Sequence, residues 1–327
     1  MKTRKLGNQG LEVPAIGLGC MVMPGFYRPG DEDQSIATLH RAAEIGINHI
    51  DSSDLYGAGK NEELIARAIK GRRSDYIIAT KFGNTRDAEG NPTVRGDPEY
   101  VQQACEASLK RLGVDDVDIY YQHRVDPTVP IEDTIGAMVR LIDQGKTRYL
   151  GLSEAAPETV RRAHAVHPIS ALQTEYSLWS RDAEEDLLPL CAELGIGYVA
   201  YSPLGRGIFT GEITGEESLA ESDRRRDHPR FQGENLESNL KLVQPVIDLA
   251  EAKGCTSSQI ALAWVLARGE QIVPIPGTRR ADHLESNAAA TDITLSADDI
   301  TTLDAALGVG AAAGTRYPAG GMKWLKL

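Results

Sequence analysis

Residues 47–81 read INHIDSSDLYGAGKNEELIARAIKGRRSDYIIATK. The segment begins and ends with short apolar runs, INHID at 47–51 and YIIATK at 76–81, each of strand length. Between these runs, residues 61–70 place apolar side chains on one helical face: Leu64, Ile65, Ala68 and Ile69. The segment therefore predicts a strand, a helix and a second strand, as in an α/β protein.

The same alternation continues along the chain. Eight buried strands are expected, at 15–19, 47–51, 76–81, 117–122, 148–153, 170–174, 197–202 and 272–276. Several are nearly continuous apolar runs, which is typical of parallel strands buried on both faces. Amphipathic patterns at 33–45, 61–70 and 99–112 predict the helices between the first four strands. This repetition predicts a (β/α)8 TIM barrel, with a doubly wound sheet as the alternative.

Further segments surround this repeat. Residues 1–13 predict a β-hairpin that turns at Asn8-Gln9-Gly10. The wide interval between the seventh and eighth strands indicates an insertion, made of a long loop and two helices. The remaining segments are the loop at 203–235, helices at 236–253, 256–267 and 297–307, and a Gly/Ala tail at 308–327. Because no linker divides the chain, we expect a single domain over 1–327.

Composition limits the classes of function. Lys and Arg number 35 and Asp and Glu 47, so the net charge is −12, which argues against general nucleic-acid binding. The four cysteines show no CxxC spacing, so neither a disulfide framework nor a zinc site is expected. We find no secretory signal and no apolar run of membrane-spanning length. A cytoplasmic protein without metal or membrane attachment is therefore expected.

Polar side chains follow the predicted strands at their carboxyl ends, where a TIM barrel places its active site. Asp51 ends the second strand and Tyr56 follows it, Lys81 ends the third, and His123 follows the fourth. A free phenol has a pKa of about 10, and a neighbouring ammonium would lower it, making Tyr56 a better acid or base. Asp51 would hold Lys81, and His123 would orient a substrate oxygen. Each residue alone has a structural alternative, such as a helix cap or a solvated lysine, but their order at successive strand ends favours catalysis.

With these residues in place, the sequence resembles the aldo-keto reductase family. The matching stretches are DSSDLYG at 51–57, ATKFG at 79–83, QHRVDP at 122–127, GLSE at 151–154, LQTEYSLW at 172–179, YSPLGRGIFTG at 201–211 and IPGTRRADHLESN at 275–287. HRVDP and YSPLGRG look most like the branch of pyridoxal-reductase-like enzymes and relatives of potassium-channel β subunits. The resemblance covers nearly the whole chain.

The resemblance implies reversible, NADPH-dependent reduction of an aldehyde or ketone to an alcohol. It implies that Tyr56 donates the proton, that Lys81 and Asp51 tune it, and that His123 positions the carbonyl. The implied cofactor-binding residues are Gly19, Cys20, Met21, Ser153, Glu154, Gln173, Tyr201, Ser202, Pro203, Leu204, Gly205, Arg206, Gly207, Gly277, Thr278, Arg279, His283 and Asn287. Tyr201 would stack on the nicotinamide, and Ser153 and Gln173 would bond its carboxamide. Many relatives have Asn where this chain has Glu154, which can only accept hydrogen bonds.

The two ends of the cofactor have separate candidate sites. The segment SPLGRG at 202–207 would approach the pyrophosphate through its glycines and Arg206. Thr278 and Arg279 precede a helix and would read the 2′-phosphate of NADPH. The run Arg224-Arg225-Arg226 is expected to be solvated, with a phosphate contact as the alternative.

The substrate is the part of the function that the sequence leaves open. Met23, Tyr27, Phe82 and Trp179 are candidates for an apolar substrate pocket, with packing beneath the loops as the alternative. Specificity in this architecture lies in loops, so only a small-molecule carbonyl compound is expected. Two further functions stay open: a slowly turning-over regulatory or scaffold protein, and a dehydrogenase working on alcohols or sugars. The oligomeric state is not predicted.

Overall fold

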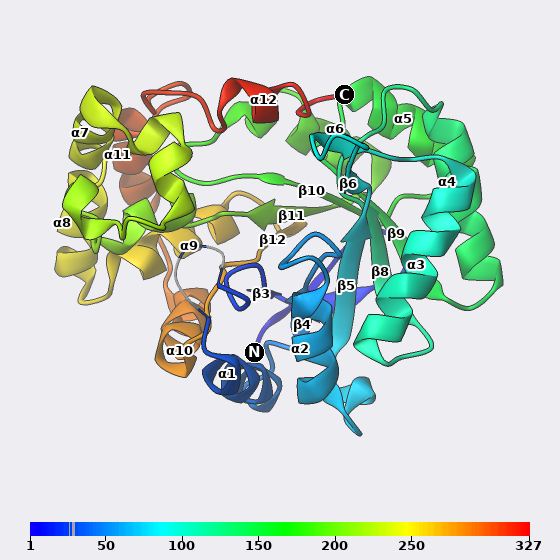
Figure 1. The fold of residues 1–327 in the computed structure, drawn as a ribbon. Coiled ribbons are helices and arrows are strands. Elements are labelled where there is room, and N and C mark those ends of the chain that lie inside the picture. Colours follow the sequence, from blue (N-terminus) through cyan, green and yellow to red (C-terminus); the bar gives the residue numbers. More distant parts are fainter. Residues whose placement is uncertain (26, 28–29) are drawn as a thin grey trace.

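The computed structural model describes residues 1–25, 27 and 30–327, and within them the strands form a closed parallel barrel (Figure 1). The eight-stranded sheet has the order β12-β11-β10-β9-β8-β5-β4-β3, and every neighbouring pair is parallel. A parallel bridge between Gly19 and Gly277 joins the two edges. The strands are β3 (Leu18–Gly19), β4 (His49–Asp51), β5 (Ile77–Phe82), β8 (Val117–Gln122), β9 (Thr147–Ser153), β10 (Ala171–Glu175), β11 (Gly197–Tyr201) and β12 (Ile272–Pro274). The predicted TIM barrel is confirmed, and the doubly wound alternative is wrong.

The pleat of the strands separates two buried layers. In β5, Ile78 packs in the large cluster between strands and helices, whereas its neighbour Ala79 belongs to a smaller cluster inside the barrel. Tyr120 and Tyr121 of β8 divide in the same way. Because side chains alternate along a strand, a parallel strand in a barrel must be apolar on both faces. This requirement explains the continuous apolar runs.

Helices surround the barrel on its outside (Figure 1). They are α1 (Glu32–Glu44), α2 (Lys60–Ile69), α3 (Pro98–Leu112), α4 (Ile131–Asp143), α5 (Pro157–Val166), α6 (Leu187–Leu194), α9 (Ser257–Ala267), α10 (Ala281–Ala289) and α11 (Ala297–Ala306). Local signals set several of their ends: Asp31 and Asp97 cap α1 and α3, and Gly113 ends α3 in the left-handed conformation.

Two hairpins flank the barrel. The predicted N-terminal hairpin is confirmed as β1 (Thr3–Lys5) and β2 (Glu12–Pro14), and its apolar side chains enter the inner cluster of the barrel. A second hairpin, β6 (Asn84–Arg86) and β7 (Pro92–Val94), follows β5 and was not predicted. Its turn is held by the Asp87 carboxylate, which accepts from the backbone N–H of Asn91 at 2.8 Å.

The insertion after β11 differs from its prediction in one respect. Residues 236–253 were expected to form one helix, but they belong to α7 (Gly233–Lys241) and α8 (Gln244–Lys253). Pro245 explains the break, because proline has no backbone N–H to donate to the carbonyl four residues before it, and it is tolerated in the first turn of the new helix, α8. The loop at 203–235 is compact, with short 3₁₀ turns from Gly205 to Phe231.

The last twenty residues are ordered as a strap that contains α12 (Ala319–Met322). The strap ends against the loop after β9: the Leu327 carbonyl accepts from the Ala156 N–H at 2.8 Å, and the Lys326 N–H donates to the Glu154 carbonyl at 2.9 Å. Among the described residues, we find neither a helix suited to crossing a membrane nor a cluster of side chains suited to a metal ion.

Candidate active site

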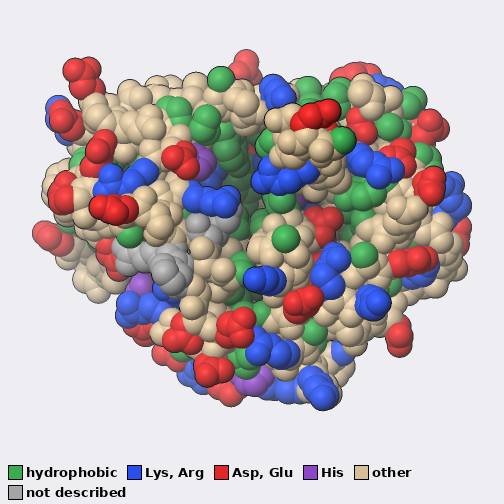
Figure 2. All heavy atoms as spheres, in the orientation of Figure 1, with side chains coloured by type: hydrophobic (Ala, Val, Ile, Leu, Met, Phe, Trp, Pro, Cys, Tyr) green, Lys and Arg blue, Asp and Glu red, His purple; other side chains and the backbone are tan. Residues whose placement is uncertain are grey.

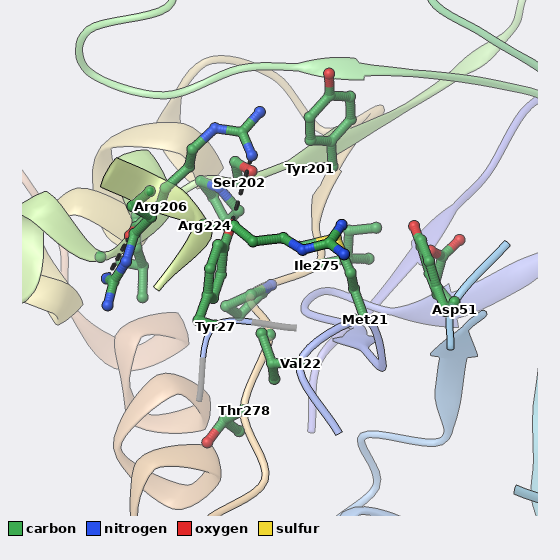
Figure 3. A pocket seen from close by; sticks show the side chains of 18 of the residues that line it. Met21, Val22, Tyr27, Asp51, Tyr201, Ser202, Arg206, Arg224, Ile275 and Thr278 are labelled. Atoms are coloured by element: carbon green, nitrogen blue, oxygen red, sulfur yellow. Dashed lines mark hydrogen bonds between the residues drawn. The ribbon is translucent and has the colours of Figure 1, made fainter. Parts of the chain in front are cut away.

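A cavity of about 830 Å³ opens at the carboxyl ends of the strands. Figure 2 shows the hollow in the middle of one face, with Lys and Arg side chains near its rim. Residues at the carboxyl ends of the strands, or shortly after them, line it, including Met21, Asp51, Tyr56, His123, Ser153, Gln173, Tyr201, Ser202 and Gly277. In Figure 3, Asp51 lies on one side of this cavity and Arg206 on the other. The fold thus brings together residues from the first and last thirds of the chain.

Lys81 is the centre of a buried group beneath this cavity. Its side chain is fully buried and forms an ion pair with the carboxylate of Asp51, which is itself buried. The Lys81 ammonium also donates to the Ser52 carbonyl at 2.8 Å and to the Tyr56 hydroxyl at 3.5 Å. The second oxygen of Asp51 accepts from the Gln173 amide at 2.8 Å. These bonds hold the ammonium next to a phenol that faces the cavity.

Burial and charge set the protonation of this group. Burial acts to lower the pKa of Lys81, but Asp51 and Tyr56 together raise this pKa by more than burial lowers it. The ammonium therefore stays charged. Burial raises the pKa of Tyr56, and Lys81 opposes this change without reversing it. The expected lowering of the Tyr56 pKa is therefore wrong in direction, because desolvation of the phenolate outweighs the neighbouring cation. Tyr56 is a protonated phenol at neutral pH, which suits a proton donor.

His123 stands next to the phenol. Its ring lies edge-on to the Tyr56 ring, with 5.9 Å between ring centroids. Its Nδ1 lies 3.1 Å from the Ser53 hydroxyl oxygen, which also accepts from the Leu55 N–H at 3.1 Å. Burial, followed by the charges of Arg124 and Lys81, holds the pKa of His123 well below its usual range. The imidazole is therefore neutral and can donate from only one nitrogen.

The opposite part of the cavity carries the donors that an anionic dinucleotide requires. Arg206, Arg224 and Arg225 line it, close to backbone with unusual geometry: Ser202 and Arg206 have φ of 50° and 58°. Gly207, with φ of 94°, leaves room for Arg225, whose Nη1 would lie 3.0 Å from a Cβ at that position. The segment after β12 adds polar side chains: Thr278, His283, Ser286 and Asn287. This donor set fits a dinucleotide with its phosphates near the arginines.

Comparison with known proteins identifies the family. Residues 15–307 match the model of the aldo/keto reductase family. This chain is an aldo-keto reductase. It is 47% identical over 315 residues to probable aldo-keto reductase 1 of Glycine max, covering 96% of this chain and 91% of that one. The family resemblance is confirmed, and the protein is an oxidoreductase of a family that acts on carbonyls and alcohols with nicotinamide cofactors.

Solved structures agree with this assignment. The glycerol dehydrogenase AKR11B4 from Gluconobacter oxydans superimposes with a TM-score of 0.85 at 27% identity, over 93% of this chain and 94% of that one. A thermostable aldo-keto reductase in complex with the inhibitor epalrestat gives a TM-score of 0.76 at 33% identity, over 94% and 100% of the two chains.

Glu154 has a different environment in this reductase from the one expected. Its carboxylate pairs with Arg316 of the C-terminal strap at 3.1 Å and accepts from the Tyr201 hydroxyl at 2.8 Å and the Glu175 N–H at 3.1 Å. It is 1% exposed. Its acceptor positions are thus engaged by the protein, and Glu154 is not in the described lining of the cavity, so its implied role in cofactor binding is not supported. Gln173, likewise, already donates to Asp51, which leaves its amide oxygen for a ligand.

Several predicted residues lie in the core and not on the wall of the cavity. Cys20, Met23, Phe82 and Trp179 are at most 3% exposed, and the described lining includes none of them. Phe82 stacks on Tyr120, and Trp179 packs edge-on against aromatic rings. The packing alternative is therefore supported for these four residues. Met21 and Tyr27 do line the cavity.

The cofactor segments show smaller departures. The residues implied to bind the cofactor that line the cavity are Gly19, Tyr201, Ser202, Pro203, Leu204, Arg206, Gly207, Gly277, Thr278, His283 and Asn287. Gly205 is buried, and the described lining includes neither Gly205 nor Arg279. The backbone carbonyl of Arg279 accepts from the Thr38 hydroxyl at 2.7 Å. Arg225 was expected to be solvated, but it is 8% exposed and pairs with Asp223 at 2.6 Å.

Sequence reasoning missed two parts of the site. Arg124 lines the cavity directly after His123, and its position in the sequence was a usable signal. The strap was read only as a Gly/Ala tail, yet Tyr317, Pro318, Gly321 and Trp324 line the cavity. Their signal is weak, because nothing in a short polar and glycine-rich stretch indicates which strand ends it covers.

Proposed function

We propose that this aldo-keto reductase reduces aldehydes or ketones to alcohols with NADPH, and that Tyr56 is the proton donor. The observation that carries the proposal is the contact of 3.5 Å between the Lys81 ammonium and the hydroxyl of Tyr56, a phenol that faces the cavity. A protonated phenol beside a buried cation can release its proton to a carbonyl oxygen as that oxygen gains charge.

Each residue of the group has a defined task in this reaction. Tyr56 transfers its hydroxyl proton to the substrate oxygen, and the Lys81 ammonium stabilises the phenolate that remains. Asp51 holds the ammonium in place, and Gln173 holds Asp51. A bound NADPH supplies the hydride for the carbonyl carbon.

Ser53 is a positioning residue for His123. Its hydroxyl oxygen already accepts from Leu55, so its hydrogen is available to an acceptor. Three acceptors are in reach: Nδ1 of His123 at 3.1 Å, the Asp54 carboxylate at 3.2 Å and the Lys81 carbonyl at 3.4 Å, and Nδ1 is the nearest. If Nδ1 accepts, the single hydrogen of the neutral ring lies on Nε2. His123 then donates to the same substrate oxygen as Tyr56 and aligns the carbonyl.

The residues that would hold the cofactor follow from the cavity. Ser153 and the amide oxygen of Gln173 would bond the carboxamide, and the Tyr201 ring would stack on the nicotinamide. Arg206, Arg224 and Arg225 would bind the phosphates, and the start of α10, with Thr278, Arg279 and His283, would read the 2′-phosphate.

The reverse reaction is a second candidate. The structural relative from Gluconobacter oxydans is a glycerol dehydrogenase, and the same group of residues serves both directions. In oxidation, Tyr56 must first lose its proton, and burial of this phenol opposes that loss at neutral pH. The pKa of Tyr56 affects the pH at which oxidation is fast, whereas the ratio of oxidised to reduced cofactor in the cell sets the direction. A regulatory or scaffold protein with slow turnover is the third candidate. Such a protein could keep the same contacts among the four residues, so the rate of turnover distinguishes it from an efficient reductase.

The test is steady-state oxidation of NADPH with a panel of aldehydes, ketones, pyridoxal and keto-sugars. We expect turnover with at least one class, and Tyr56→Phe should lower it about 10²- to 10⁴-fold, the range for loss of general acid catalysis. The dissociation constant of NADPH, measured by fluorescence, should stay within about threefold of wild type, because Phe retains the ring. A variant that keeps more than a tenth of the turnover when chemistry limits the rate would contradict the role of Tyr56.

A further inference from the structure

Arg124 is the cation of the catalytic end of the cavity that no carboxylate neutralises. It is half-buried and lines the cavity beside His123 and Ser153. Its Nη1 donates to the His123 carbonyl at 2.8 Å and to the Ser153 hydroxyl at 3.3 Å. No ion pair joins it to a described carboxylate, and its Nε and Nη2 groups make no hydrogen bond within the described residues.

Other buried arginines around the cavity differ from Arg124 in this respect. Arg206 and Arg230 pair with Glu175, Arg225 pairs with Asp223, and Arg316 pairs with Glu154. A charged group removed from water is costly unless it is paired. Each of these four arginines has a carboxylate partner in the fold, although Arg206 and Arg230 share Glu175. Arg124 has no such partner among the described residues, which points to an anion from outside the chain.

The charges at the catalytic end lead to the same conclusion. Lys81 and Asp51 cancel, as do Arg316 and Glu154, whereas Tyr56 and His123 are neutral. The sum is one positive charge, on Arg124, within a protein of net charge −12. Arg124 also lies close enough to lower the pKa of both Tyr56 and His123, so its charge acts where the carbonyl must sit.

We propose that Arg124 binds an anionic group of the substrate, so that the preferred substrates are aldehydes or ketones that carry a carboxylate. A guanidinium offers a planar fork that matches a carboxylate, and the Nε and Nη2 groups form one edge of that fork. The Nη1 bonds to His123 and Ser153 fix the plane of the fork. This inference rests on the proposed carbonyl reduction and adds the charge of the substrate to it.

The experiment compares matched substrates that differ only in charge. The pairs are glyoxylate and glyoxylamide, 4-oxobutanoate and 4-oxobutanamide, and 4-formylbenzoate and 4-formylbenzamide, each assayed for kcat/KM with saturating NADPH. We expect at least one acid to exceed its amide about ten- to one-hundred-fold, the range for hydrogen bonds to charged groups. Arg124→Met should reduce that acid-to-amide ratio to near one, and Arg124→Lys should retain part of it.

Controls separate the possible failures. Arg148→Met makes the same change at the opposite, amino-terminal end of β9, where Arg148 pairs with Asp116 and Asp118, and it should leave the ratio unchanged. If Arg124→Met does not fold, inhibition of wild type by benzoate relative to benzamide gives the answer, and benzoate should inhibit at least tenfold more strongly. Amides that are reduced as fast as acids, or a ratio that survives Arg124→Met, would overturn the role of Arg124 alone. No turnover of any carbonyl compound in wild type would instead overturn the proposed function.

Discussion

At the scale of the residue, a substitution of Lys81 tests whether its charge influences the pKa of the Tyr56 phenol. Lys81→Met removes the cation that opposes the effect of burial, so the pKa of Tyr56 should rise further. In alcohol oxidation, Tyr56 acts as a base only when deprotonated, so kcat/KM should rise with pH through this pKa. We expect the rise to move to higher pH in the variant. A rise at the same pH in both proteins would show that Lys81 does not tune Tyr56.

The same substitution should cost stability. It leaves Asp51 buried with the Gln173 amide and without its cation, and breaking a buried pair in this way costs about 3–5 kcal/mol. Asp51→Asn combined with Lys81→Met removes both charges and is the matched control. Denaturant unfolding should show the double variant to be more stable than Lys81→Met alone.

Ser53 offers a second residue-scale prediction. Ser53→Ala removes the hydroxyl that we infer fixes the tautomer of His123, and turnover should fall about 3- to 10-fold, as expected for one hydrogen bond. Ser53→Thr keeps the hydroxyl and should recover most of the loss. The ¹⁵N chemical shifts of His123 should report protonated Nε2 in wild type and a mixture in Ser53→Ala. Unchanged shifts would contradict the positioning role.

The sequence predicts which residues meet at the site better than it predicts their protonation and their hydrogen-bond partners. Asp51, Tyr56, Lys81 and His123 come together because each follows a strand, and strand ends share one face of a barrel. The direction of the Tyr56 pKa depends on how deeply later segments bury the ring, which no local pattern contains. The partner of Glu154 lies 162 residues away in sequence, so only tertiary structure reveals it.

At the scale of the element, strands and helices with strong periodicity were predicted closely, whereas short irregular elements were not. β8 has the predicted bounds, because its apolar run is continuous and buried on both faces. The hairpin of β6 and β7 was missed because its two short strands, NTR and PTV, show no alternation of apolar and polar side chains. The break between α7 and α8 was visible in Pro245, but the surrounding apolar periodicity concealed it.

The strap yields an element-scale prediction. Arg316→Met leaves the Glu154 carboxylate buried without its cation, so the free energy of unfolding at pH 8 should fall by about 3–5 kcal/mol. Denaturant unfolding of the variant and of wild type at this pH measures the loss.

Glu154→Gln combined with Arg316→Met is the control for the strap. This double variant has no buried charge at the site and should recover stability at pH 8. A double variant that is no more stable than Arg316→Met alone would show that the strap acts by packing and not by this ion pair.

At the scale of the whole molecule, charge is distributed unevenly. The chain carries −12 overall, yet Arg124, Arg206, Arg224 and Arg225 line one cavity. The composition correctly indicated an acidic protein, but it could not show where the cations gather. Three of these arginines come from the segment 203–235, which the long insertion places over the strand ends. An anionic cofactor is therefore attracted locally by a protein whose net charge repels it.

Cofactor choice is the whole-molecule consequence of this distribution. NADPH carries one more phosphate group than NADH. We propose that Arg279, just before α10 and far in sequence from Tyr56 and Lys81, binds that phosphate. Arg279→Ala should weaken NADPH binding by about tenfold or more, the lower limit for a charged hydrogen bond, and leave NADH binding nearly unchanged.

Raising the salt concentration should lower the NADPH-to-NADH affinity ratio in wild type and change this ratio less in Arg279→Ala. The neighbouring Arg280 is exposed and pairs with Asp282, so Arg280→Ala is a matched control that should leave the ratio intact. Fluorescence titration of both cofactors decides the matter: an equal loss of the two affinities in Arg279→Ala would show that another residue reads the 2′-phosphate.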